Sequence, residues 1–139
     1  MAGVEELGLG LDLGGTNARA AVVDRGTGRI VAARRSPVAD RSPRAVADLA
    51  ASVARAAASE AGVDPRALGT AGVGVAGQCL GATGVVLNAP NYGWRDVPLG
   101  ELLARALGQP VRVANDLSAA AWGERCFGAA RGLSDVLLV

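Results

Sequence analysis

Residues 7–17 read Leu-Gly-Leu-Gly-Leu-Asp-Leu-Gly-Gly-Thr-Asn, and this stretch decides the fold. Leucine occupies every second position from Leu7 to Leu13, a period of two that predicts a strand with one apolar face. The glycines and polar residues of 14–17 predict a tight turn at its end. The residues after the turn predict two more strands joined by a short turn, so the chain begins with an antiparallel meander that has no room for crossover helices. We expect these two strands over 18–24 and 29–35.

The rest of the chain alternates between helices and strands. Ser42 and Pro43 predict a helix N-cap and a first helical position, and apolar residues then recur at helical spacing as far as Gly62. Further helices are expected over 98–107 and 115–127, and the remaining strands over 70–76, 83–87, 111–114 and 135–139, with an ordered loop in between. A meander followed by strands joined through helices predicts an α/β fold with a mixed sheet and helices on its faces, and 139 residues suffice for one domain.

Charge and composition narrow the possible functions. Half of the residues are hydrophobic, the formal net charge is +1, and all 14 basic residues are arginines spread along the chain. A nucleic-acid-binding protein would concentrate such charges in a basic stripe, so we expect no nucleic-acid partner. The chain has no lysine and no histidine, which excludes P-loop phosphate binding, Schiff-base chemistry and histidine-based triads. Carboxylates must therefore carry any acid–base chemistry.

The ends of the chain and its cysteines indicate the cellular context. Glu5 and Glu6 stand where a secretory signal would carry basic residues, and no stretch is apolar enough to span a bilayer. We therefore expect a cytoplasmic protein without a membrane partner. Cys79 and Cys126 match no zinc-binding spacing, so we expect no zinc site in this chain and interpret both as small packing residues.

The first segment that suggests chemistry is the turn after the first strand. Two glycines there let main-chain N–H groups converge without Cβ atoms in the way, which suits a phosphate. A plain hairpin turn would use the same glycines for their backbone freedom, and that interpretation stays open. Asp12 favours a site, because a carboxylate in an apolar strand is costly to bury unless it faces a polar group such as a hydrated Mg²⁺ ion.

The second segment is Asn115-Asp116, which lies where a short strand is expected to end and a helix to begin. In open sheets with helices on their faces, ligands gather at the carboxyl ends of the strands, and a carboxylate there can accept a proton from a substrate hydroxyl. The alternative is that one of the two residues is only a helix N-cap.

The third segment covers residues 72–79 and 84–99. It begins with a literal Gly-x-Gly-x-x-Gly, but these glycines lie within and at the end of a strand and no helix follows them, so we reject dinucleotide binding. Asn91 by itself predicts either a turn or a ligand contact. We interpret Trp94 as a packing residue.

Together the three segments resemble the ROK family of sugar kinases, and within it the glucokinases. Residues 11–17 look like the first phosphate loop, and 115–124 look like the segment with the catalytic aspartate. Residues 84–99 look like the family's Asn-Ala-Pro-Asn-x-x-Trp-Arg-Asp-Val-Pro-Leu block. The resemblance implies that residues 1–139 form the amino-terminal lobe of an actin-like, ribonuclease-H-like fold. It also implies ATP-dependent phosphorylation of a hexose, with glucose converted to glucose 6-phosphate.

The resemblance also implies roles for individual residues. Asp116 would be the catalytic base, Asn91 and Asn115 would bind sugar hydroxyls, and Gly77 would let the backbone approach the sugar. It implies that Asp12 binds Mg²⁺ through water. It also implies that the ATP phosphates bind to the turn of Gly14, Gly15, Thr16 and Asn17. Most relatives have Pro-Gly in place of Ala76-Gly77 and Ala-Asn in place of Leu117-Ser118, so the details of the sugar site are expected to differ here.

Other parts of the family pattern are expected beyond Val139, where the apolar run 135–139 stops without a cap or a turn. They are a second phosphate loop, an adenosine-binding segment, a Glu and a His that complete the sugar site, and a cysteine-rich site for structural Zn²⁺. The chain by itself is therefore expected to be inactive, and the complete protein to be a homodimer.

Relatives leave two other functions open. The first is a kinase for an N-acetylhexosamine such as N-acetylmannosamine, and the phosphate donor can be ATP or polyphosphate. The second is a sugar-sensing transcriptional regulator, whose helix-turn-helix domain precedes the first phosphate loop. The first strand is expected near Leu7, which leaves no space for such a domain, so we expect the kinase.

Overall fold

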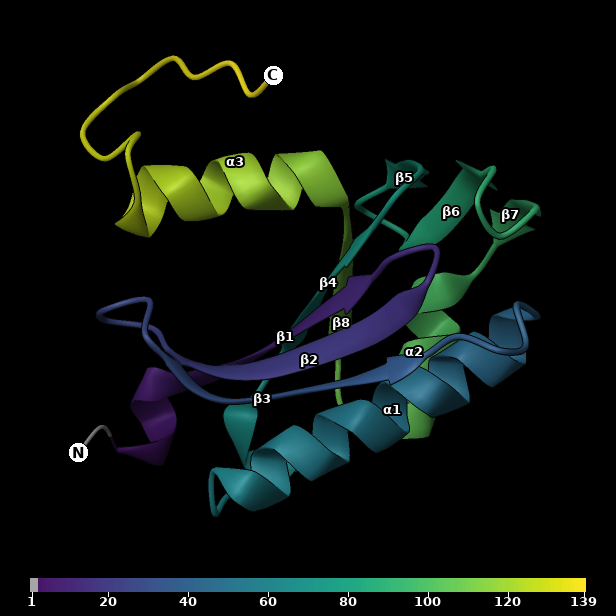
Figure 1. The fold of residues 1–139 in the computed structure, drawn as a ribbon, viewed down its shortest axis with the longest axis horizontal. Coiled ribbons are helices and arrows are strands. Elements are labelled where there is room, and N and C mark those ends of the chain that lie inside the picture. Colours follow the sequence, from purple (N-terminus) through teal and green to yellow (C-terminus); the bar gives the residue numbers. More distant parts are fainter. Residues whose placement is uncertain (1–2) are drawn as a thin grey trace.

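The computed structural model describes residues 3–139, which form two sheets and three α-helices (Figure 1). The larger sheet has the strand order β3-β2-β1-β4-β8, and the smaller one the order β5-β6-β7. The strands are β1 (Leu7–Leu13), β2 (Asn17–Asp24), β3 (Ile30–Pro37), β4 (Ala71–Val75), β5 (Gln78–Leu80), β6 (Val85–Ala89), β7 (Trp94–Val97) and β8 (Val111–Asn115). The helices are α1 (Pro43–Glu60), α2 (Leu99–Leu107) and α3 (Asp116–Phe127), with short 3₁₀ turns at Val4–Glu6 and Pro65–Leu68.

The larger sheet confirms the predicted mixed architecture. β1, β2 and β3 pair as an antiparallel meander, whereas β4 pairs in parallel with β1 on one side and with β8 on the other. In this register Val75 lies between Leu13 and Asn115, the last residues of β1 and β8. The three parallel strands therefore end at the same edge of the sheet, and the segments that follow them begin side by side.

The two faces of this sheet are covered differently (Figure 1). One face carries the leucines of β1 together with small apolar residues of β2 and β4, and α1 and α2 pack against it. α1 suits this position because its alanines and valines form one buried stripe, in which Val46, Ala50, Ala54 and Ala57 are fully buried. On the opposite face the start of α3 contacts β4 and β8, and Phe127 at its end lies against Gly28 in the turn between β2 and β3.

The smaller sheet corrects part of the sequence prediction. A loop with one short strand was expected between 76 and 98, but β5, β6 and β7 pair there as an antiparallel sheet. The chain turns between β5 and β6 through a bond in which Gly84 N–H donates to the Leu80 carbonyl (2.8 Å). β5 and β7 are only three and four residues long, so their sequences are too short to show a period of two.

α3 agrees with its predicted bounds, but its surroundings do not match the expectation. Its first turn contacts β4 and β8 and Phe127 near its end lies against Gly28, but the helix buries none of its residues. Trp122 is 63% exposed, and Cys126, expected to pack, is exposed as well.

The strand predicted over 135–139 is absent, since these residues have no regular structure in the chain described. A strand forms only when a neighbour satisfies its backbone groups, and no described strand pairs with this segment. Among residues 3–139 no helix is long and apolar enough to cross a membrane.

Candidate functional site

The turn between β1 and β2 directs its carbonyl groups toward the protein. The Gly14 carbonyl accepts from the Tyr92 hydroxyl (2.5 Å), the Gly15 carbonyl from the Arg41 guanidinium (3.2 Å), and the Thr16 carbonyl from Val38 N–H (2.9 Å). Across residues 3–139 the N–H groups of Gly15 and Thr16 donate to no protein acceptor. Free main-chain N–H groups suit phosphate binding. In this turn such N–H groups are held in place because the neighbouring carbonyls are hydrogen-bonded to the protein.

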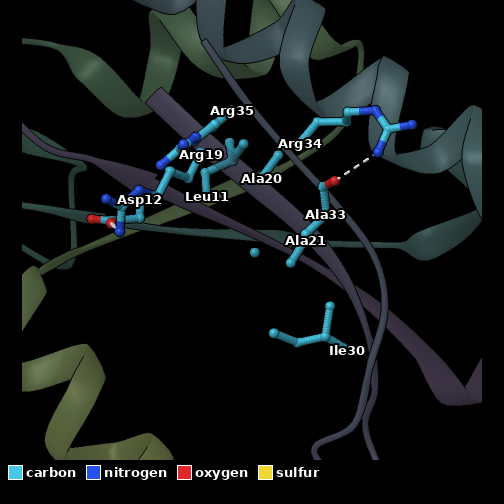
Figure 2. Close-up of a pocket in the computed structure, with 10 residues that line it drawn as sticks. Leu11, Asp12, Arg19, Ala20, Ala21, Ile30, Ala33, Arg34 and Arg35 are labelled. Atoms are coloured by element: carbon cyan, nitrogen blue, oxygen red, sulfur yellow. Dashed lines mark hydrogen bonds and ion pairs between the residues drawn. The ribbon is translucent and has the colours of Figure 1, made fainter. Parts of the chain in front are cut away.

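Asp12 lies two residues before Gly14, the first residue of this turn, on the open face of the sheet (Figure 2). Its carboxylate faces the Arg19 guanidinium across the β1–β2 pair at 3.9 Å, and Arg35 is paired with Arg19 on the next strand. The Asp12 side chain is 51% exposed, so its charge needs no buried partner. Asp12 and its arginine neighbours form the polar end of a pocket of about 520 Å³ whose floor is the small residues Gly10, Ala21 and Ala33.

Asp116 begins α3 directly above Gly74. Asn115 is the N-cap of this helix, since its Oδ1 accepts from the N–H groups of Leu117 (3.0 Å) and Ser118 (3.2 Å). The cap that was one interpretation of the Asn-Asp pair is therefore Asn115. The Asp116 Oδ1 also accepts from Leu117 N–H (2.9 Å).

The surroundings of Asp116 place it on the same side of the sheet as Asp12. A Cβ atom at Gly74 would lie 3.4 Å from the Asp116 Cα, and Gly74 is paired with Asp12 in the β1–β4 register. Partners in a parallel pair direct their side chains to the same face, so the two carboxylates flank Gly74 on one face. Burial raises the pKa of the neighbouring Cys79 thiol, and the negative charge of Asp116 raises it further, which keeps that thiol neutral.

Asn91 lies against the turn between β1 and β2. A Cβ atom at Gly15 would be 3.5 Å from the Asn91 Cβ, an ordinary van der Waals distance, so the two segments are direct neighbours. Asn115 is tied to the same region, because its Nδ2 donates to the Gly77 carbonyl (2.8 Å). A Cβ atom at Gly77 would meet the Asn88 carbonyl oxygen at 2.5 Å, so the glycine is needed for contact between this loop and β6. The structure thus brings Gly77, Asn91 and Asn115 to the edge where the turn and Asp116 lie.

Two residues of this region were missed by the sequence analysis. Tyr92 is buried, stacks on Trp94 with ring centroids 4.4 Å apart, and donates to the phosphate turn. Arg41 precedes α1 and touches both the turn and the Asn91 loop. Tyr92 could have been suspected from its place beside Asn91, whereas nothing in the local sequence distinguishes Arg41 from the other exposed arginines.

Comparison with known proteins decides the family. The model of the ROK family matches residues 8–139. This chain belongs to the ROK family. The fold that the family resemblance implied, a lobe of actin-like type, is therefore confirmed together with the mixed sheet.

Individual relatives agree with this assignment. A glucokinase from Streptomyces coelicolor is 38% identical over 133 residues, which are 96% of this chain and 40% of the relative. The crystal structure of a ROK family glucokinase from Streptomyces griseus, in complex with glucose and AMPPNP, superposes with a TM-score of 0.78 at 40% identity, over 91% of this chain and 38% of the other. A putative xylose repressor from a Caldicellulosiruptor species is 41% identical over 68 residues, 49% of this chain and 17% of the repressor. The chain thus spans about two-fifths of the length of the glucokinases it matches.

Proposed function

We propose that the complete protein transfers the γ-phosphoryl group of ATP to the 6-hydroxyl of glucose, and that residues 1–139 form its amino-terminal lobe. The observation that carries this proposal is the register Leu13–Val75–Asn115, because it sets the Gly14–Asn17 turn beside Asp116 at one edge of the sheet. Support comes from the glucokinase relatives, one of which was crystallised with glucose and an ATP analogue.

Each part of the edge has one task in this reaction. The free N–H groups of Gly15 and Thr16 hold phosphate oxygens of ATP, with Gly14 and Asn17 closing the turn through the bond from Gly14 N–H to the Asn17 carbonyl (3.1 Å). Asp116 accepts the proton of the attacking hydroxyl, which leaves the oxygen free to bond to phosphorus. Positioning the hydroxyl in line with the γ-phosphate supplies most of the remaining rate enhancement.

The sugar is held by the groups around Asp116. The Asn91 side chain lies against the phosphate turn and is exposed, so its amide is free to bond sugar hydroxyls. The Asn115 amide donates one hydrogen to Gly77 and has a second one for a hydroxyl. The bonded Gly77 carbonyl fixes the loop that borders the sugar.

A magnesium ion fits the donor atoms at Asp12. Mg²⁺ is commonly held by one or two carboxylates together with phosphates and water, and the half-exposed Asp12 carboxylate provides one such contact beside the turn. No group of three or more metal-ligating side chains gathers within residues 3–139, so Asp12 would act together with the nucleotide. When bound, the ion neutralises charge on the phosphates.

The second lobe is part of this proposal. ATP and sugar would lie between two lobes that close on each other, so the isolated chain would not phosphorylate glucose. The remaining ATP contacts, the structural Zn²⁺ site and a homodimer interface would belong to the complete protein.

The substitution Asp116→Asn in the complete protein tests the function. The amide keeps the size of the side chain but cannot accept the proton, so kcat should fall by roughly 10²- to 10⁴-fold, about 3 to 5 kcal/mol of barrier, while the Kd for glucose changes little. A coupled assay of glucose 6-phosphate formation and a glucose titration measure the two effects. Asp48→Asn is the control, since Asp48 is exposed on α1. An unchanged kcat in Asp116→Asn would remove Asp116 from the mechanism.

A sugar-sensing regulator is the second candidate, because a putative xylose repressor matches about half of the chain. A regulator that only senses sugar would be stabilised by its sugar, whereas a kinase would also be stabilised by ATP. Thermal unfolding of the complete protein with glucose, N-acetylmannosamine, xylose, or ATP with Mg²⁺ separates the two. Stabilisation by xylose together with no response to ATP would favour the regulator.

A further inference from the structure

Arg41 connects the two halves of the candidate site. Its Nη1 donates to the Asn91 carbonyl (2.7 Å) and its Nη2 to the Gly15 carbonyl (3.2 Å). These acceptors lie in the sugar-facing loop and in the phosphate turn, 50 and 26 residues from Arg41 in sequence. One planar guanidinium thus sets the separation of two segments that are not neighbours in the chain.

The segment that carries Arg41 is itself held in place. The Trp94 indole N–H donates to the Arg41 carbonyl (2.7 Å), and Ser42 N–H donates to the Asp40 carboxylate (2.8 Å) just before α1. That bond to Ser42 N–H holds the pKa of Asp40 below its usual value, so the carboxylate is charged at neutral pH. The guanidinium therefore projects from a backbone that is held independently of its two bonds, so these bonds can position the two loops.

No carboxylate neutralises Arg41 within the described residues, since both of its bonds go to carbonyl oxygens. The Gly15 carbonyl that it binds belongs to the same planar peptide group as Thr16 N–H, so this bond fixes the orientation of that free donor. The two bonds of Arg41 also set the distance between the turn and Asn91. The orientation of the Thr16 donor and the place of the sugar loop consequently depend on this side chain.

Tyr92 provides a second link, because it belongs to the same loop as Asn91 and binds the turn from there. Its hydroxyl donates to the Gly14 carbonyl (2.5 Å), which shares a peptide group with Gly15 N–H. Burial raises the pKa of this hydroxyl while the charge of Arg41 opposes the rise, and the hydroxyl keeps the proton that it donates. Tyr92 therefore ties the loop to the turn through one hydrogen bond, whereas Arg41 contributes two.

We infer that Arg41 is a positioning residue that couples the phosphate turn to the sugar-facing loop, so that the donor and acceptor sites form together. This inference rests on the proposed sugar kinase function. It assigns to Arg41, and to a lesser extent to Tyr92, an effect on both substrates, and to neither residue a role in proton transfer.

The test compares Arg41→Met, Arg41→Lys and Tyr92→Phe in the complete protein. Arg41→Met should raise the KM for ATP and the KM for glucose, each by about tenfold, and leave kcat within about threefold, because the reacting groups remain. Arg41→Lys should recover part of both values, since its ammonium can still donate to at least one carbonyl. Tyr92→Phe should also raise both KM values, but by less than Arg41→Met, because it removes one of the three bonds between the loops and Arg41→Met removes two.

Arg44→Met is the matched control. It removes the same charge three residues away, and Arg44 has no hydrogen bond or ion pair with any described residue. A rise in only one KM in Arg41→Met, or an equal rise in Arg44→Met, would overturn the coupling role. If the unmodified protein phosphorylates no hexose, the proposed function is wrong. If the unmodified protein is active and Arg41→Met has the same KM values, the proposed function stands and the coupling role of Arg41 is wrong.

Hydrogen exchange tests the coupling without any catalysis. Gly14 N–H and Tyr92 N–H are both bonded, to the Asn17 and Ala89 carbonyls, and they report on the turn and on the loop. Arg41→Met should speed exchange in both segments by about tenfold or more, whereas Arg44→Met should change neither. Unchanged exchange in both segments of Arg41→Met would show that Arg41 does not hold them.

Discussion

The two faces of β1 differ in burial, in side-chain type and in the elements that cover them. Leu9, Leu11 and Leu13 lie on one face, are at most 5% exposed, and pack beneath α1. Gly10 and Asp12 alternate with them on the other face, where no atom lies within 4 Å of the position that a Gly10 Cβ would occupy and the Asp12 side chain is 51% exposed. A single strand therefore supports the core with one set of residues and carries Asp12 toward the candidate site with the other.

This difference shows how a strand can serve stability and chemistry at once. Because successive side chains point to opposite faces, each set can change without disturbing the other. Substitutions on the leucine face should affect stability, and those on the open face should affect ligand binding or very little at all. Three substitutions in β1 test this separation.

The largest effect is expected for Leu13→Ala. Leu13 is fully buried, so the variant loses apolar contacts and leaves a cavity, and the free energy of unfolding should fall by about 2–5 kcal/mol. Urea unfolding of the complete protein measures this loss. Leu137→Ala is the matched control, since Leu137 is 85% exposed and its truncation should cost less than about 0.5 kcal/mol. Similar losses in the two variants would mean that the leucine face is not the core of the lobe.

An intermediate effect, on binding instead of stability, is expected for Asp12→Asn. The variant should raise the KM for ATP with Mg²⁺ by about tenfold, which corresponds to about 1.4 kcal/mol, because the amide cannot supply a negative oxygen to a hydrated ion. Its stability should stay within about 0.5 kcal/mol, because Asp12 and Arg19 are a half-exposed pair 3.9 Å apart. Steady-state kinetics at several Mg²⁺ concentrations, with Asp135→Asn as the control, measure the change. If the KM for ATP depends on Mg²⁺ concentration in the same way in Asp12→Asn and in the unmodified protein, Asp12 does not contribute to Mg²⁺ binding.

The smallest effect is expected for Gly10→Ala. No atom lies within 4 Å of the position that its Cβ would occupy, and its backbone needs no positive φ. Alanine restricts the unfolded chain more than glycine does, so the free energy of unfolding should stay the same or rise by up to about 1 kcal/mol. The same urea experiment decides this. A loss of stability would show that another segment of the complete protein packs on the open face.

Much of the larger sheet could be predicted from local patterns. The alternating leucines, the glycine turn and Ser42-Pro43 each specify an element through neighbouring residues, and the structure confirms all three. The smaller sheet was not predicted, because strands as short as Gln78–Leu80 form through pairing and not through their own pattern. The expected strand over 135–139 was wrong for the related reason that an apolar run needs a partner to become a strand.

The candidate site divides in a similar way. Asp116 and the glycine turn could be proposed from the sequence, since a family motif surrounds each of them. The roles of Arg41 and Tyr92 could not, because both depend on carbonyl groups that carry no sequence signal and lie 26 to 78 residues away. Asn115 was proposed from the same motif as Asp116, but its bond to the Gly77 carbonyl became visible only in the folded chain.

The sequence alone determined the strands of the meander, the starts of the helices and the residue types available for phosphate transfer, because period, capping and composition act between near neighbours. The tertiary structure decided which of those residues meet. The parallel register of β1, β4 and β8 places the turn beside Asp116, and hydrogen bonds across tens of residues set the distance from the turn to Asn91. Such contacts are selected by the packing of the whole lobe, so no local pattern contains them.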